Sequence, residues 1–177
     1  MEIQELKTII NDMAVQHSYP GFDMRSLKLG LPEAITRSPA RLFKDALQDN
    51  DVLVRLAALR WFQERPGDAK KNLDVLVKTL DDQDEWVRLE GIATIAQIAN
   101  TKENTNAKEA IVEAVARLLT DESLQVQKAA ANACGKFQLK TQTVIEQLKQ
   151  AAQSNDVEVR WKSQKALRKL GMYSQPN

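Results

Sequence analysis

The chain has 177 residues, of which 43% are hydrophobic and 28% are charged, and its formal net charge is +1. This composition excludes a disordered tail, and one cysteine with one histidine excludes an internal disulfide and the Cys/His spacings of zinc sites. The charge is uneven, because residues 1–100 carry 13 Lys or Arg and 16 Asp or Glu, whereas residues 101–177 carry 12 and 8. We therefore expect a globular protein whose second part attracts anionic groups.

Residues 1–38 contain an amphipathic helical pattern near the start and are then interrupted by Pro20 and Pro32. We interpret them as an N-terminal helical capping segment, which covers the apolar end of the unit that follows. The alternative is a hook for a specific partner, formed by the loop from His17 to Phe22. The first residues lack a basic start and an apolar signal-peptide core, which together with the lone cysteine favours a cytoplasmic protein.

After residue 38 one short phrase occurs four times, each time between two helical patterns. The four copies align on Val54, Val87, Val126 and Val159, which are spaced 33, 39 and 33 residues apart. The six extra residues of the second interval fall in the polar loop at 100–106. This periodicity predicts an all-α protein, an α-solenoid of four helix pairs with an N-terminal helical cap. We expect the repeats at about 39–65, 69–100, 107–138 and 141–171, and a loose tail at 172–177.

Two positions of the phrase indicate a structural ladder. The residue three before the valine can cap the second helix of each pair, and the residue one after it is Arg or Gln. In the third repeat both positions become neutral, as expected if the capping carboxylate meets the arginine of its own or the adjacent repeat. We therefore assign a structural role and not a ligand-binding role to this set: Asp51, Arg55, Asp84, Arg88, Ser123, Gln127, Asp156 and Arg160.

A second set of positions predicts a binding surface. Residues two, six and ten after the valine share one stripe of each second helix, and solenoids bind partners along the concave face that these helices form. The stripe is apolar to neutral in the first two repeats and basic in the last two, where Trp161 adds an aromatic anchor. The predicted groove consists of Leu56, Arg60, Leu89, Lys128, Asn132, Lys136, Trp161, Lys165 and Lys169.

Catalytic patterns are missing from the sequence. It has no Gly-rich phosphate loop, and no Ser or Cys has a plausible histidine partner, so we expect no enzymatic activity, no cofactor and no metal site. Cys134 occupies a position that is apolar in other repeats, which favours a core residue over a nucleophile. The acidic run at 81–85 is interpreted as a solvated turn that includes a helix cap.

The recurring Asp-x-x-Val-Arg phrase, the small residue four after the valine and the helix-pair period resemble the HEAT-repeat family, particularly the short bacterial form found in phycobilisome lyases. The resemblance covers residues 39–171. It implies a helical solenoid, and it implies a function among scaffolds, bilin-attachment lyase subunits, DNA-glycosylase-like proteins and a hydroxylase. The hydroxylase binds metal through repeated His-Glu pairs, and a chain whose one histidine is His17 excludes that activity.

These observations favour a non-catalytic protein-binding scaffold or assembly factor that docks a partner segment in the concave groove, and the basic half of the groove suits a segment of acidic character. The first alternative is a binder of nucleic-acid backbone through the basic C-terminal half, which the near-neutral net charge disfavours. The second is a bilin-lyase-like subunit or a chaperone of a pigment protein. A basic face that is merely solvated is the remaining interpretation.

Overall fold

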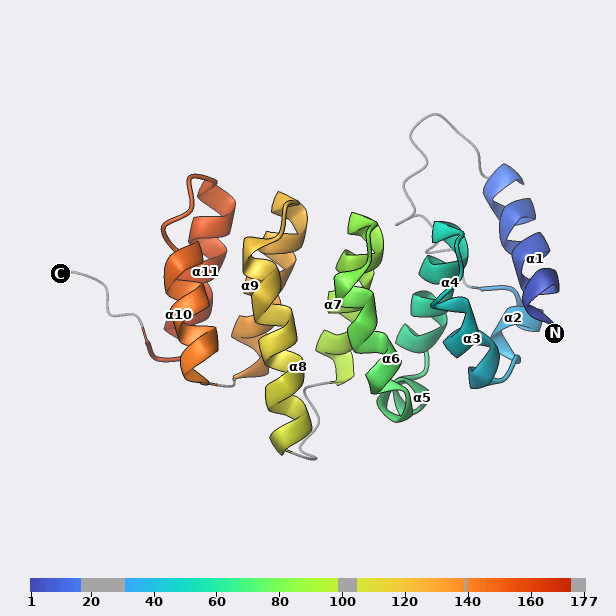
Figure 1. Cartoon of the computed structure of the whole chain (residues 1–177), viewed down its shortest axis with the longest axis horizontal. Helices are drawn as coiled ribbons and strands as arrows, with labels where there is room; N and C mark the ends of the chain where they lie inside the picture. Colours follow the sequence, from blue (N-terminus) through green and yellow to red (C-terminus); the bar gives the residue numbers. More distant parts are fainter. Residues whose placement is uncertain (17–30, 99–104, 139, 173–177) are drawn as a thin grey trace.

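The computed structural model describes residues 1–16, 31–98, 105–138 and 140–172, and this part of the chain is helical throughout apart from its connections (Figure 1). The predicted all-α solenoid is confirmed. The loop from His17 to Phe22 and the tail at 173–177 lie outside the described residues. The helices are α1 (Ile3–Gln16), α2 (Glu33–Thr36), α3 (Ala40–Ala46), α4 (Val52–Gln63), α5 (Pro66–Lys71), α6 (Leu73–Lys78), η2 (Thr79–Asp81), α7 (Glu85–Ile98), α8 (Thr105–Arg117), η3 (Leu118–Thr120), α9 (Leu124–Phe137), α10 (Gln142–Ala151) and α11 (Val157–Lys169).

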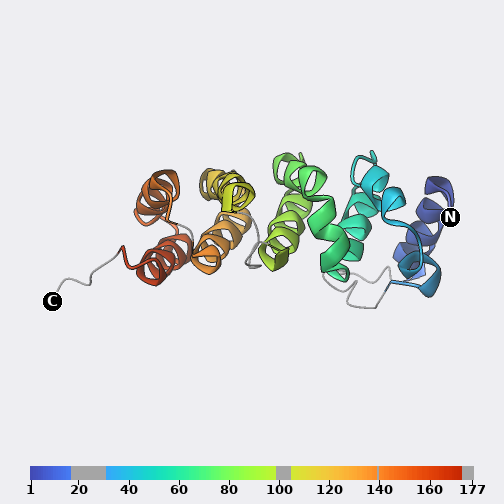
Figure 2. The same ribbon diagram turned by 90° about the horizontal axis from the view of Figure 1, so that it is seen from below.

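The helices form four pairs, which we number in chain order: α3 with α4, α6 with α7, α8 with α9, and α10 with α11. The second helices α4, α7, α9 and α11 form one row and the first helices the other (Figure 2). Neighbouring second helices pack more extensively than neighbouring first helices, and the contact of α9 with α11 is the largest. We call the contacts between successive pairs the first, second and third junctions. Helix α1 packs against α3 and α4, before the first pair.

The capping residues begin three of the four second helices. The Asp51 carboxylate accepts a hydrogen bond from the Leu53 N–H (2.9 Å), as Asp84 does from Trp86 and Asp156 from Val159. These bonds satisfy N–H groups that the first helical turn leaves without a partner. Ser123 differs from the sequence expectation, because its hydroxyl makes no such bond at the start of α9.

The core runs continuously along the interior between the two rows. The Phe43 and Trp61 rings stack with their centroids 4.4 Å apart, and Phe62 packs against Trp61 edge-on. Cys134 is fully buried, and this burial raises the pKa of its thiol to about 12, so the thiolate is disfavoured. None of the helices described here is long and apolar enough to cross a lipid bilayer.

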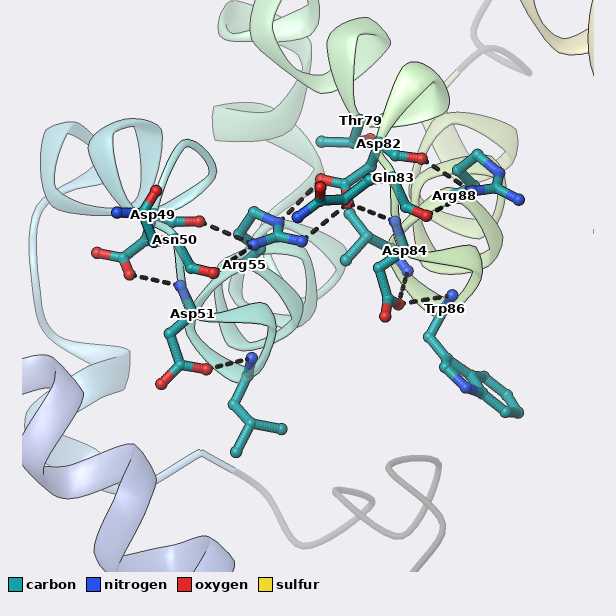
Figure 3. A network of polar contacts seen from close by, with 12 residues as sticks. Asp49, Asn50, Asp51, Arg55, Thr79, Asp82, Gln83, Asp84, Trp86 and Arg88 are labelled. Atoms are coloured by element: carbon teal, nitrogen blue, oxygen red, sulfur yellow. Dashed lines mark hydrogen bonds and ion pairs between the residues drawn. The ribbon is translucent and has the colours of Figure 1, made fainter.

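Buried arginines connect the first three pairs through bidentate ion pairs. Arg55 of α4 donates from Nε and Nη2 to the two carboxylate oxygens of Asp82, both at 2.9 Å, while Nη1 donates to the Asp49 and Asn50 carbonyls (Figure 3). Arg88 repeats the arrangement one pair later with Asp121, at 2.8 and 2.9 Å. Both arginines are only 5% exposed, so the first and second junctions are each closed by a desolvated, bidentate ion pair.

The carboxylates in this ladder are not the ones that the sequence suggests. The capping carboxylates of Asp51 and Asp84 point at their own helices, whereas the aspartate two residues before the cap faces the arginine of the preceding pair (Figure 3). Asp82 Oδ1 also accepts a hydrogen bond from the Asp84 N–H (2.9 Å), which fixes the turn that presents it. The predicted pairing of capping acid with arginine is therefore corrected by a shift of two residues.

At the third junction the ladder is neutral. Gln127 occupies the arginine position and donates to the Asp121 carbonyl of its own pair (2.6 Å), and Ser154 occupies the aspartate position. The Ser154 hydroxyl accepts from the Asp156 N–H (3.2 Å), as the aspartates do elsewhere. The neutral residues at the arginine and aspartate positions of the third junction are thus Gln127 and Ser154, and not Gln127 and the capping residue Ser123.

Helix α1 closes the other end of the ladder. Lys7 Nζ lies 2.8 Å from the Asp49 carboxylate, the first aspartate of the series. Burial opposes ionisation of Asp49, but the hydrogen bonds from Lys7 and from the Asp51 N–H outweigh it and hold the pKa of this carboxyl below its ordinary value. Lys7 therefore stands where an arginine of a preceding pair would stand.

Candidate binding groove

The groove begins with the close approach of α9 to α11. A Cβ atom at Gly135 would lie 3.1 Å from both Cα and Cβ of Ala166, closer than side chains ordinarily pack. Together with the buried Ala131, these small residues bring the two backbones together and leave a shallow floor between them. The larger side chains of both helices then stand around this floor.

A pocket of about 180 Å³ lies over that floor. Four residues of the predicted groove line it, namely Asn132 from α9 and Trp161, Lys165 and Lys169 from α11. Lys162 also lines it, although it lies outside the predicted stripe. The structure therefore gathers the aromatic anchor, an amide and three lysines into one concave site at the C-terminal end of the second-helix row.

The pocket side chains are accessible and carry positive charge. Trp161 is 50% exposed, and Lys165 Nζ lies 4.6 Å from the centroid of its ring, a cation–π contact that orients both side chains. Lys162 lies 3.7 Å from Glu158 in the same helix. Within the described part of the chain, Lys165 and Lys169 form no ion pair, so their charges are available to an anionic ligand.

Lys128 does not belong to this open surface. It is 9% exposed, and its Nζ lies 2.8 Å from Glu158 and 3.8 Å from Asp156, across the third junction. The hydrogen bond between them raises the pKa of Lys128 and lowers that of Glu158. Its charge is already neutralised, so its predicted role in binding a partner is replaced by a contact between helix pairs.

The N-terminal part of the predicted groove is closed. Leu56 is 6% exposed, and Leu89 is half-buried. Arg60 is half-buried and lies 3.5 Å from Glu64 in the same helical turn. Lys136 is exposed on α9 but does not line the pocket. Position two after the valine is thus buried or half-buried in each of the three pairs that another pair follows.

This arrangement is suited to bind an acidic, extended group. Exposed lysines attract carboxylates, the Trp161 face packs against apolar atoms, and the Asn132 amide can donate to or accept from a peptide backbone. Sequence reasoning missed the contributions of Gly135 and Ala166. The signal was present, because small residues at facing positions of neighbouring helices indicate close approach.

Comparison with known proteins supports the fold. Residues 111–175 match the family model of HEAT repeats. No curated protein is significantly similar in sequence to the chain.

Several solved structures are similar. An engineered protein is 27% identical with a TM-score of 0.56, over 75% of this chain and 62% of that protein. A computationally designed armadillo repeat protein for modular peptide recognition is 23% identical with a TM-score of 0.55, over 72% and 63%. A designed armadillo repeat protein in complex with the peptide (KR)4 is 18% identical with a TM-score of 0.61, over 94% and 93%. The chain thus spans less than two thirds of the first two proteins.

Proposed function

We propose that the chain is a non-catalytic protein-binding scaffold that docks an acidic segment of a partner protein in the pocket between α9 and α11. The observation that carries this proposal is the exposed Trp161 beside Lys165 and Lys169, two lysines without a counter-charge in the described structure. A partly apolar, partly charged hollow of this kind anchors one aromatic or aliphatic side chain while the lysines orient neighbouring carboxylates.

The similar fold of designed peptide-binding proteins supports a peptide ligand. One of them is in complex with (KR)4, a basic peptide. The pocket described here has the opposite preference, because its charged lining is lysine and not aspartate or glutamate. Charge complementarity therefore favours an acidic segment over a basic one for this chain.

The test is binding of a fluorescent acidic peptide, with alternating Asp and Glu around one Leu, measured by fluorescence polarisation at low and moderate salt. Changing both Lys165→Glu and Lys169→Glu should weaken binding by roughly tenfold or more, because like charges then face each other. Trp161→Ala should weaken binding at both salt concentrations, because its contact with the peptide is apolar.

The matched control changes two other exposed lysines, Lys78→Glu and Lys149→Glu, in the row of first helices. It alters the net charge by the same amount but leaves the pocket intact, so binding should persist. Equal loss in the control and in the pocket variant would contradict the proposal, since binding would then follow net charge alone. Tighter binding of a single-stranded oligonucleotide than of the peptide, with steep salt dependence, would favour nucleic acid instead.

A further inference from the structure

The last helix pair, α10 with α11, repeats the contacts between arginine and backbone carbonyls that are found in the first and second pairs. Arg160 Nη1 donates to the Ser154 and Asn155 carbonyls, the same two positions that Arg55 and Arg88 contact in their own pairs. In those pairs the same backbone contacts hold the guanidinium so that Nε and Nη2 bind an aspartate of the next pair. Arg160 is therefore preoriented to receive a carboxylate.

No carboxylate occupies that position in the described structure. Arg160 Nε and Nη2 have no hydrogen-bond or ion-pair partner there, and Arg160 remains partly exposed. An Nε–Nη2 edge matches the two oxygens of one carboxylate, as the bidentate contacts at the first and second junctions demonstrate. The end of the stack thus presents half of an ion pair whose complete form occurs twice inside the molecule.

The apolar residues beside Arg160 are also exposed, unlike the residue beside Arg55. Leu56 follows Arg55 and is 6% exposed, whereas Trp161 follows Arg160 and is 50% exposed. Val157, one turn earlier on α11, is 68% exposed. The third pair, by contrast, has Gln127 at the position of the arginine. The carboxylate-binding arrangement is therefore interrupted inside the stack and restored at its end.

We propose that Arg160 binds an aspartate of a separate helical partner, which stacks on α11 and presents an Asp-x-Asp turn like Asp82-Gln83-Asp84. This inference goes beyond the groove, because it uses the end of the stack. A second copy of this chain is disfavoured as the occupant, since each aspartate of this series is already engaged. Lys7 binds Asp49, and Arg55 and Arg88 bind Asp82 and Asp121.

The experiment is an NMR titration of the full chain that observes the arginine Nε–H signals and the Trp161 indole N–H. The probe is a blocked hexapeptide with the sequence of residues 81–86, compared with the same peptide carrying Asn in place of Asp82. The Arg160 signal should shift and saturate, and the Asn peptide should bind roughly fivefold more weakly, as expected for loss of one exposed charged pair. The signals of Arg55 and Arg88 should not move, because their carboxylates are already present.

Two variants separate this site from the groove. Arg160→Gln introduces the residue type found at Gln127, so the variant should fold. It should weaken binding of the Asp peptide by the same factor as the Asn substitution in the peptide. Lys165→Gln with Lys169→Gln should leave the Arg160 shift intact. A titration that moves Trp161 but not Arg160, or equal affinity for both peptides, would overturn this inference while leaving the groove proposal standing. Arg160-dependent self-association in sedimentation velocity would overturn the choice of a separate partner.

Discussion

The second and third junctions of the stack are built in different ways. At the second, Arg88 and Asp121 form a buried bidentate ion pair whose side chains are each 6% exposed. At the third, Gln127 and Ser154 are neutral, and two other features join α9 to α11: the close approach at Gly135 and the contact of Lys128 with Glu158. The pocket lies at this third junction. The junction without an arginine–aspartate ion pair is thus the one where the backbones of α9 and α11 approach closely and where lysines line an open pocket.

The largest expected effect comes from breaking the second junction. Arg88→Ala should lower the free energy of unfolding by about 3–5 kcal/mol, because it strands the buried Asp121 carboxylate. Urea denaturation followed by circular dichroism measures this loss. Replacing both partners by those of the third junction, Arg88→Gln with Asp121→Ser, should recover most of it. If the double variant were as unstable as Arg88→Ala, the neutral junction would not be an equivalent solution.

The third junction should be most sensitive to backbone spacing. Gly135→Ala places a methyl group against Ala166, and the two helices must separate, which should cost about 1–3 kcal/mol of unfolding free energy. The control is Gly67→Ala, where no atom lies within 4 Å of the added methyl group. This control should change stability little. Equal melting temperatures for the two variants would show that α9 and α11 tolerate a wider spacing.

Acid should weaken the third junction through its carboxylates. A hydrogen bond from Lys128 holds the pKa of Glu158 below its ordinary value, and the Val159 N–H does the same for Asp156. Such groups stabilise the folded state above their unfolded pKa, and this contribution is lost as the pH falls through the lower folded pKa. The free energy of unfolding should therefore decline below about pH 4.5. Glu158→Gln should show a shallower decline in urea titrations between pH 7 and 3, and an unchanged slope would contradict this assignment.

The smallest effect is expected at the end of the ladder. Arg160→Ala removes the same residue type as Arg88→Ala but leaves no carboxylate without its partner, so the loss should be below about 1 kcal/mol. Thermal unfolding of the two variants side by side makes the comparison directly. A loss at Arg160 as large as that at Arg88 would mean that the isolated chain already supplies a carboxylate there.

The repeat period predicted the helix pairs, and the capping aspartates predicted where α4, α7 and α11 begin. The ion-pair partners were missed because Asp82 lies in an acidic turn that was interpreted as solvated, and because the pairing was assigned to the capping aspartate two residues later. A signal existed, since Asp49, Asp82, Asp121 and Ser154 all stand five residues before the aligned valine. The burial of Leu56 and Lys128 was not readable from the stripe, because position two after the valine is most exposed only in the last pair, at Trp161.

The register of the ladder also bears on how the number of repeats can change. The second pair presents Asp82 toward the preceding pair and Arg88 toward the following one, so duplicating it would join Arg88 to a new copy of Asp82 and reproduce a matched contact. Deleting the third pair would instead join Arg88 to Ser154 and leave a guanidinium without its carboxylate. Recombination within this gene would therefore lengthen the stack at its second pair more readily than it would shorten it at its third.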